Sequence, residues 1–209
     1  MKSVLCFGDS NTYGLKPDGT GRFDRSERWT GILSSMLGQE EYSVIEEGLV
    51  GRTTVFEDST RQGRNGSKLL PILLETHNPI DQVVLMLGTN DCKTVYNASP
   101  ALIGRGVEIL LKQIKAYDEH TQVLLLSPIH LGDVVWKKEY DPEFDEDSVN
   151  TSKELQEVFE KLAVQYGCQF LAASDVAKPS ETDQEHMDSK AHKQLAKAIY
   201  DKLTAVEAR

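Results

Sequence analysis

The chain of 209 residues has few cysteines, no excess of basic residues and no long apolar run. Its three cysteines, Cys6, Cys92 and Cys168, lie far apart without C-x-x-C spacing, so they indicate neither a disulfide framework nor a zinc site. A net charge of -10 argues against a nucleic-acid partner, because phosphate binding depends on clustered lysine and arginine. No apolar run approaches the roughly 20 residues of a membrane span, so we expect no membrane partner.

The length of the chain is compatible with one α/β domain, which we expect to cover residues 1–209. A chain of this size can bury roughly 70–75% of its unfolded surface, enough for a core without disulfides or metals. No internal repeat, low-complexity tract or Pro/Gly-rich linker divides it. The first apolar run starts at Val4 and leaves no room for a secretion signal ahead of it. Together with the isolated cysteines, this favours a cytoplasmic protein.

Five apolar runs are too short for helices and rich in Val, Leu and Ile, as expected for strands buried on both faces. They are Val4–Phe7, Tyr42–Ile45, Gln82–Leu87, Gln122–Leu126 and Cys168–Ala172. Helical patterns alternate with them: Trp29–Leu37 before Gly38, Lys68–Thr76 starting near Pro71, Leu102–Tyr117, a helix opened by Ser152, and Ser189–Val206. This alternation predicts βαβ crossovers and a parallel sheet with helices on both faces.

Two connections are long enough to be either functional or mobile. Residues 15–28 contain four basic side chains, whereas residues 131–147 mix Trp136 and other aromatic residues with many carboxylates. For the second segment, a wall of the substrate pocket or a subunit contact and a merely solvated acidic loop remain open alternatives.

A Gly-Asp-Ser turn closes the first strand and sets Ser10 at its carboxyl end, where α/β sheets keep their chemistry. Ser10 is interpreted either as a nucleophile whose own N–H faces a developing oxyanion, or as a helix N-cap. Asp9 is its immediate neighbour and points to the opposite side, so we expect it to hold the turn.

Two further turns end strands two and three. Gly48 lets the backbone approach a substrate closely, although an ordinary turn glycine is the alternative. Nearby Glu46, Glu47 and Arg52 are expected to form a structural ion pair. In the Gly88-Thr89-Asn90-Asp91 turn, Asn90 can aim a side-chain N–H at an oxyanion, and Asp91 can accept N–H groups of the loop.

Asp183 and His186 lie three residues apart, just before the last helix. That spacing lets the carboxylate reach Nδ1 of the imidazole while Nε2 takes a proton from serine. A histidine pKa of about 6.5 suits this exchange near neutral pH. His130 follows strand four and is a second candidate for the pocket. The other histidines are interpreted as cap, surface or packing residues: His77, His120 and His192.

Ser, Gly, Asn and Asp-x-x-His in this order resemble the SGNH, or GDSL-type, hydrolase superfamily. Further motifs are similar to its bacterial arylesterase/acyltransferase branch: Cys6-Phe7-Gly8-Asp9-Ser10, Arg28-Trp29-Thr30-Gly31, Glu46-Glu47-Gly48-Leu49, Arg52-Thr53-Thr54, Asn65-Gly66, Leu70-Pro71, Thr76-His77 and Met86-Leu87-Gly88-Thr89-Asn90-Asp91. The resemblance is close over the first half of the chain and depends mainly on Asp183 and His186 in the second.

The resemblance implies a flavodoxin-like three-layer sandwich, with a five-stranded parallel sheet of order 2-1-3-4-5. It implies a serine esterase that needs no metal or cofactor. Ser10 would be the nucleophile, His186 the base and Asp183 its orienter, with an oxyanion hole of Ser10, Gly48 and Asn90. Candidates for substrate contacts are Asp9, Trp29, His130 and Trp136. The family usually has glycine where this chain has Gln184, and members of the branch form homo-oligomers.

The leading hypothesis is hydrolysis, or transfer, of short-chain acyl groups from a small-molecule ester. Carbohydrate O-acetyl esterase, thioesterase and lysophospholipase activities would use the same three residues. An alternative of another class is a flavodoxin-like binding module without turnover, in which residues 8–11 cradle a phosphate. Asp9 would repel that anion, and such a module has no need of Asp183 beside His186.

Overall fold

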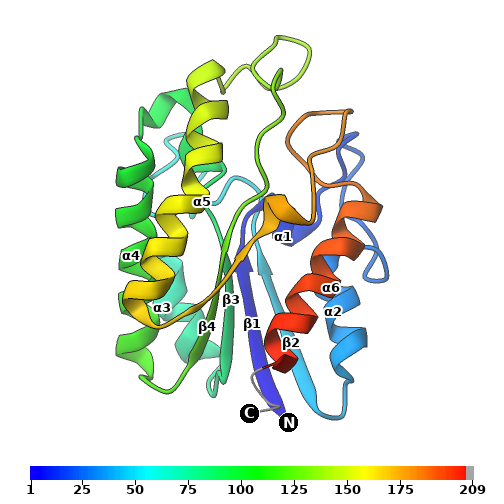
Figure 1. Cartoon of the computed structure of the whole chain (residues 1–209), viewed down its shortest axis with the longest axis vertical. Helices are drawn as coiled ribbons and strands as arrows, with labels where there is room; N and C mark the ends of the chain where they lie inside the picture. The colour runs from blue at the N-terminus through cyan, green and yellow to red at the C-terminus, as the bar shows by residue number, and fades with distance from the viewer. Residues whose placement is uncertain (206–209) are drawn as a thin grey trace.

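A computed structural model describes residues 1–205, and it contains one parallel sheet of five strands (Figure 1). The strands are β1 (Lys2–Gly8), β2 (Tyr42–Gly48), β3 (Gln82–Met86), β4 (Gln122–Ser127) and β5 (Gln169–Ala172). Their order is β2-β1-β3-β4-β5, and every neighbouring pair is parallel. This confirms the expected sheet order. Val206, expected in the last helix, lies outside the described residues.

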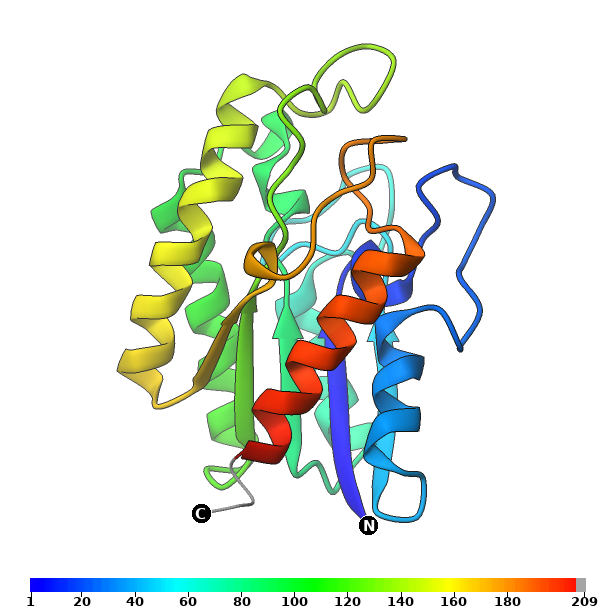
Figure 2. The same ribbon diagram turned by 45° about the vertical axis from the view of Figure 1, so that its right-hand side comes forward.

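Helices cover both faces of the sheet, which makes the three-layer α/β sandwich that the alternation predicted (Figures 1 and 2). The helices are α1 (Ser10–Tyr13), α2 (Trp29–Leu37), α3 (Gly66–Thr76), α4 (Pro100–Tyr117), α5 (Glu146–Tyr166) and α6 (Ser189–Ala205), with short 3₁₀ turns η1 (Asn90–Cys92), η2 (Thr94–Tyr96) and η3 (Ala173–Asp175). Helices α3, α4 and α5 lie on one face, and α2 and α6 on the other. Alternate strand residues enter the two cores: Leu5 and Phe7 face α3–α5, whereas Val4 and Cys6 face α2 and α6.

The expected start of α3 near Pro71 is wrong, because the helix begins at Gly66 and carries Pro71 inside it. Proline has no N–H, so the carbonyl of Ser67, four residues earlier, loses its helical donor. In the structure the Nε2 of Gln113, on α4, donates to that carbonyl oxygen at 2.8 Å. A side chain of a neighbouring helix therefore satisfies the acceptor, and the helix continues through the proline.

Helix α5 begins at Glu146 and not at the expected Ser152, because Asp145 forms a capping box with Ser148. The Ser148 N–H donates to Asp145 Oδ1 at 2.7 Å, and the Asp145 N–H donates to Ser148 Oγ at 3.1 Å. Such reciprocal bonds satisfy two of the donors that a helix start leaves free. The acidic segment before α5 is consequently shorter than expected.

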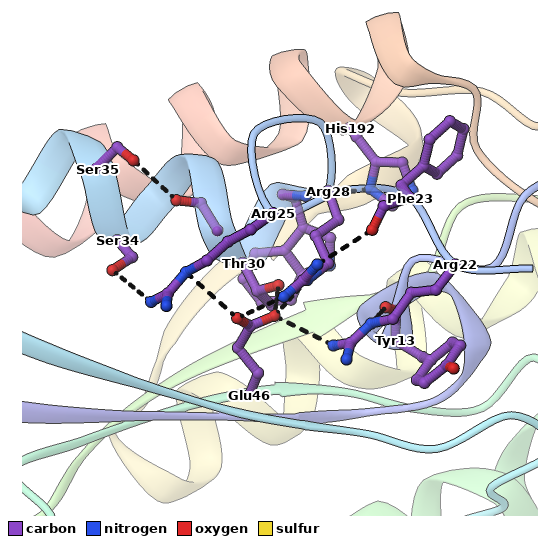
Figure 3. Close-up of polar contacts among 12 residues, drawn as sticks. Tyr13, Arg22, Phe23, Arg25, Arg28, Thr30, Ser34, Ser35, Glu46 and His192 are labelled. Carbon is purple, nitrogen blue, oxygen red and sulfur yellow. Dashed lines mark hydrogen bonds and ion pairs between the residues drawn. The ribbon is translucent and has the colours of Figure 1, made fainter.

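Glu46, on strand β2, binds side chains of the connection between α1 and α2 and of the start of α2 (Figure 3). Its carboxylate accepts from Arg28 Nε at 2.5 Å, from Thr30 Oγ1 at 2.6 Å and from Arg22 Nη2 at 3.2 Å. The expected ion pair between Arg52 and Glu46 or Glu47 is therefore wrong, because the arginines that donate hydrogen bonds to Glu46 are Arg28 and Arg22. Arg52 instead donates Nη1 to the backbone carbonyls of Gly8, at 2.9 Å, and of Glu47.

Candidate active site

The register of the sheet places the three strand-end motifs at one edge. Gly8, the last residue of β1, pairs with Gly48 on β2 and with Met86 on β3. Ser10 opens α1 two residues beyond Gly8, and Asn90 opens η1 four residues beyond Met86. Asn90 Nδ2 donates to the carbonyl of Arg52 at 3.2 Å, which ties the third motif to the second. The structure thus brings Ser10, Gly48 and Asn90 to the same carboxyl edge of the sheet.

Ser10, His186 and Asp183 form a continuous row of hydrogen bonds at this edge. Ser10 Oγ lies 2.9 Å from His186 Nε2, and His186 Nδ1 lies 2.6 Å from Asp183 Oδ2. The other carboxylate oxygen of Asp183 accepts from the backbone N–H of His186 at 2.9 Å. Ser10 is 2% and His186 8% exposed, whereas Asp183 is partly exposed, so the Ser10–His186 end of the row is nearly buried. The three residues therefore have the geometry of a nucleophile, its base and the orienter of that base.

Asn11 holds the loop of His186 against α1, a role that the sequence did not predict. Its Nδ2 donates to the carbonyl of Glu185 at 3.3 Å, and its Oδ1 accepts from the N–H of Met187 at 3.0 Å. Both partners lie more than 170 positions away. The residue follows directly on Ser10, so only its place in the Gly-Asp-Ser-Asn turn could have drawn attention to it.

Gln184 adopts the left-handed backbone conformation that normally favours glycine, with φ of 63°. Hydrogen bonds of its backbone and side chain hold it there. Its N–H donates to Ser180 O at 2.8 Å, its carbonyl accepts from Gly132 N at 2.7 Å, and its Nε2 donates to Glu181 Oε2 at 3.1 Å. The loop thus brings the carboxylate of Asp183 to the ring of His186 although position 184 is not a glycine.

Glycine is required at position 48 for a steric reason. A Cβ built there would lie 2.1 Å from the backbone nitrogen of Tyr13 on α1. Only the absence of a side chain lets the end of β2 pack directly on the helix that carries Ser10.

Two buried aspartates support the strand-end turns. Asp9 Oδ1 accepts from Asn11 N at 2.9 Å and caps α1, and burial raises the pKa of Asp9 to about 6. Asp91 Oδ1 accepts from Thr54 N at 3.0 Å and from the Thr54 hydroxyl, joining the β3 turn to the segment after β2. Burial raises the pKa of Asp91 to about 7. Asp9 therefore holds the turn and, at 1% exposed, offers little surface to a substrate.

Three carboxylates act on the charge state of His186. Burial tends to lower its pKa, but the charge of Glu185, the hydrogen bond to Asp183 and the charges of Asp183 and Asp9 together raise the pKa to about 9. Glu185 Oε2 lies 3.8 Å from Nδ1, a proximity that the sequence did not predict. We therefore expect His186 to titrate at alkaline pH in the folded protein and not near neutral pH.

Trp29, His130 and Trp136 are the remaining candidates for substrate contacts. Trp29 is a correction: its side chain is 0% exposed in the core beside α2 and α6, so the indole has no surface to offer a substrate. His130 lines a separate hollow with Gly132 and Gln184. Trp136 is partly buried against the core on the α3–α5 side of the sheet and donates Nε1 to Asp133 O at 3.2 Å.

Within residues 1–205, no group of three or more His, Cys, Asp or Glu side chains is arranged to hold a metal ion. The same part of the chain contains no helix long and apolar enough to cross a membrane.

Comparisons with known proteins identify the family of the chain. Residues 6–193 match the model of the GDSL-like lipase/acylhydrolase family. Est24, a carbohydrate acetylesterase from Sinorhizobium meliloti, is 34% identical with a TM-score of 0.90, over 99% of this chain and 100% of its own. The aryl esterase of Mycobacterium smegmatis is 32% identical with a TM-score of 0.89, over 98% and 99%. A putative arylesterase from Agrobacterium tumefaciens is 30% identical with a TM-score of 0.88, over 99% and 100%.

No curated protein matches the chain in sequence. The family match nevertheless spans far more than half of the chain, and the similar structures cover nearly all of it. The chain belongs to the GDSL-like lipase/acylhydrolase family and is a carboxylic-ester hydrolase.

Proposed function

We propose that the protein hydrolyses short-chain acyl esters through an acyl-serine intermediate, with Ser10 as nucleophile, His186 as base and Asp183 as orienter. The observation that carries the proposal is the unbroken row from Ser10 Oγ through both ring nitrogens of His186 to Asp183 Oδ2, with spacings of 2.9 and 2.6 Å. A serine is a weak nucleophile until a base accepts its proton, and this row supplies the base.

In the first half of the reaction, Ser10 Oγ attacks the ester carbonyl while its proton passes to His186 Nε2. The N–H groups of Ser10 and Gly48 and the Nδ2 of Asn90 bind the oxyanion that forms. His186 then returns the proton to the departing alcohol, and the acyl group stays on Ser10. Water activated by His186 releases the acid, and an alcohol in its place gives transfer.

The acyl part is proposed to be short because Ser10, Asn90 and His186 are all nearly buried, which leaves little room beside the nucleophile. A carbohydrate acetate is a second candidate, favoured by the similarity to a carbohydrate acetylesterase over the whole chain. Thioesters and lysophospholipids would use the same row of residues. The alternative of a phosphate-binding module is disfavoured, because the buried Asp9 lies at the turn that would have to receive the anion.

The test is covalent labelling with a fluorophosphonate probe, followed by a panel of substrates. We expect the probe to modify Ser10, and Ser10→Ala or His186→Ala to lower kcat by ~10⁴–10⁶, with the double variant little worse than either. Ser35→Ala, on the exposed side of α2, is the matched control and should label as the wild type does. Turnover of p-nitrophenyl esters of increasing acyl length, measured beside acetylated sugars, then ranks the substrates. Unchanged activity of Ser10→Ala in a folded protein contradicts the proposal.

A further inference from the structure

Glu185 is a nearly buried carboxylate, 7% exposed, beside the ring of His186. Its backbone is held from both sides: the N–H donates to Asp183 Oδ1 at 3.1 Å, and the carbonyl accepts from Asn11 Nδ2 at 3.3 Å. Its side chain therefore starts from a fixed point, and Oε2 lies 3.8 Å from His186 Nδ1.

At that distance Glu185 does not share the ring proton. His186 Nδ1 is already bonded to Asp183 Oδ2 at 2.6 Å, and 3.8 Å is too long for a hydrogen bond. Two carboxylates, the partly exposed Asp183 and the nearly buried Glu185, thus flank one ring nitrogen in different ways: Asp183 by a hydrogen bond, and Glu185 by charge alone. Opposite charges within about 4–6 Å favour the ionised forms of both groups.

Other charged groups around Glu185 leave His186 as its nearest cation. The groups that act on Glu185 or on its cationic neighbours are His186 and Asp183 on the same loop, Lys93 between η1 and η2, Asp141 and Glu143 on the segment before α5, and Asp9 before α1. Lys93 is the second cation, but its Nζ bonds to Glu143 Oε2 at 2.5 Å. Burial raises the pKa of Glu185, so the carboxylate gains most by facing a protonated ring.

We propose that Glu185 is a positioning residue that acts through His186, stabilising by its charge the imidazolium that forms when Ser10 gives up its proton. The proposal rests on the proposed function of Ser10 and His186. It deepens that function, because an imidazole whose protonated form is stabilised is a stronger base. Its unprotonated form, which accepts the proton of Ser10, is then populated only at higher pH. The acid limb of kcat/KM therefore lies above neutral pH in the native protein.

The test is the pH profile of Glu185→Gln, which removes the charge and keeps the shape. We expect the acid limb of kcat/KM to move to lower pH by about one to three units, the range expected for a charge at this distance. Glu139→Gln removes an exposed carboxylate from the segment before α5 and is the charge-matched control; its limb should not move. Glu185→Met, an unbranched apolar side chain of similar length, serves as the second variant and should shift the limb in the same direction.

Ring ¹⁵N shifts of His186, followed by NMR against pH, provide a readout that does not depend on turnover. We expect the pH at the midpoint of the His186 titration to be lower in both Glu185 variants and unchanged in Glu139→Gln. An unmoved midpoint in either folded Glu185 variant overturns the proposal. Should the fluorophosphonate probe fail to label Ser10, the proposed function would fail instead, and the ring titration would still report on the pair.

Discussion

The geometry around Ser10 depends on a few residues that other residue types could hardly replace. Asn11 uses both a donor and an acceptor on the loop of His186, and Gly48 leaves space that even one methyl group would fill. Asn90 differs from both, because its Nδ2 also bonds to a backbone carbonyl in the resting structure. Its proposed role in catalysis therefore has to be separated from its role in the turn.

Asn90→Ala separates these two roles. As an oxyanion donor, Asn90 should bind the tetrahedral intermediate more strongly than the ground-state ester, so its loss should lower kcat rather than raise KM. Removing one such donor typically costs ~10²–10³ in kcat, or about 3–4 kcal/mol. The measurement is kcat per fluorophosphonate-titrated site, beside a thermal melt. A sharp drop in Tm with kcat within a few-fold would instead assign Asn90 to the turn alone.

At the scale of elements, helix α2 and the segment before it depend on one carboxylate. Glu46 is 14% and Arg28 12% exposed in their side chains, and Thr30 from the first turn of α2 completes the contact (Figure 3). Because the Arg28 end of α2 has no side-chain cap of its own, Glu46 also supplies negative charge where a helix start favours it.

Glu46→Gln should therefore destabilise the protein strongly. It leaves Arg28 largely buried without a counter-ion, and breaking such a pair from one side costs about 3–5 kcal/mol. We expect a large fall in Tm and faster proteolysis within residues 15–28. Glu40→Gln, an exposed glutamate just before β2, is the control and should melt as the wild type does. Equal melts for the two variants would show that the arginine contacts contribute little.

The elements also show where sequence patterns stop being informative. The strands were recognisable because buried parallel strands are continuous apolar runs, and their order followed from the family resemblance. The start of α3 could not be predicted, because the carbonyl oxygen of Ser67 that Pro71 leaves without a donor is satisfied by Gln113 on another helix. Likewise, Ser10, Asp183 and His186 stood out by residue type, whereas Asn11, the backbone of Gln184 and the proximity of Glu185 depend on contacts between distant segments. The homo-oligomer and the cytoplasmic location stay predictions.

For the whole molecule, the buried titratable groups make stability depend on pH. The pKa of His186 is raised from 6.5 to about 9 in the fold, so its contribution is fully present below pH 6.5 and is lost between pH 6.5 and 9. The raised pKa values of Asp9 and Asp91 act in the same direction at lower pH, because both carboxyls ionise more readily in the unfolded chain.

We therefore expect Tm to fall as pH rises from 6.5 to 9, and His186→Gln to reduce that slope. The measurement is a series of thermal melts at constant ionic strength. His120→Gln, at an exposed position after α4, is the control and should keep the native slope. A slope unchanged in His186→Gln would mean that the fold does not hold the proton of this ring.

Ser10 and His186 are separated by 176 positions, one directly after the first strand and the other directly before the last described helix. Under the proposed mechanism, synthesis on the ribosome makes the nucleophile available for nearly the whole elongation of the chain without its base. On that mechanism, a partly made or partly refolded molecule holds an ordinary serine, and we expect turnover to begin only when the segment before α6 docks on Asn11. Esterase activity thus reports completion of folding rather than formation of the sheet.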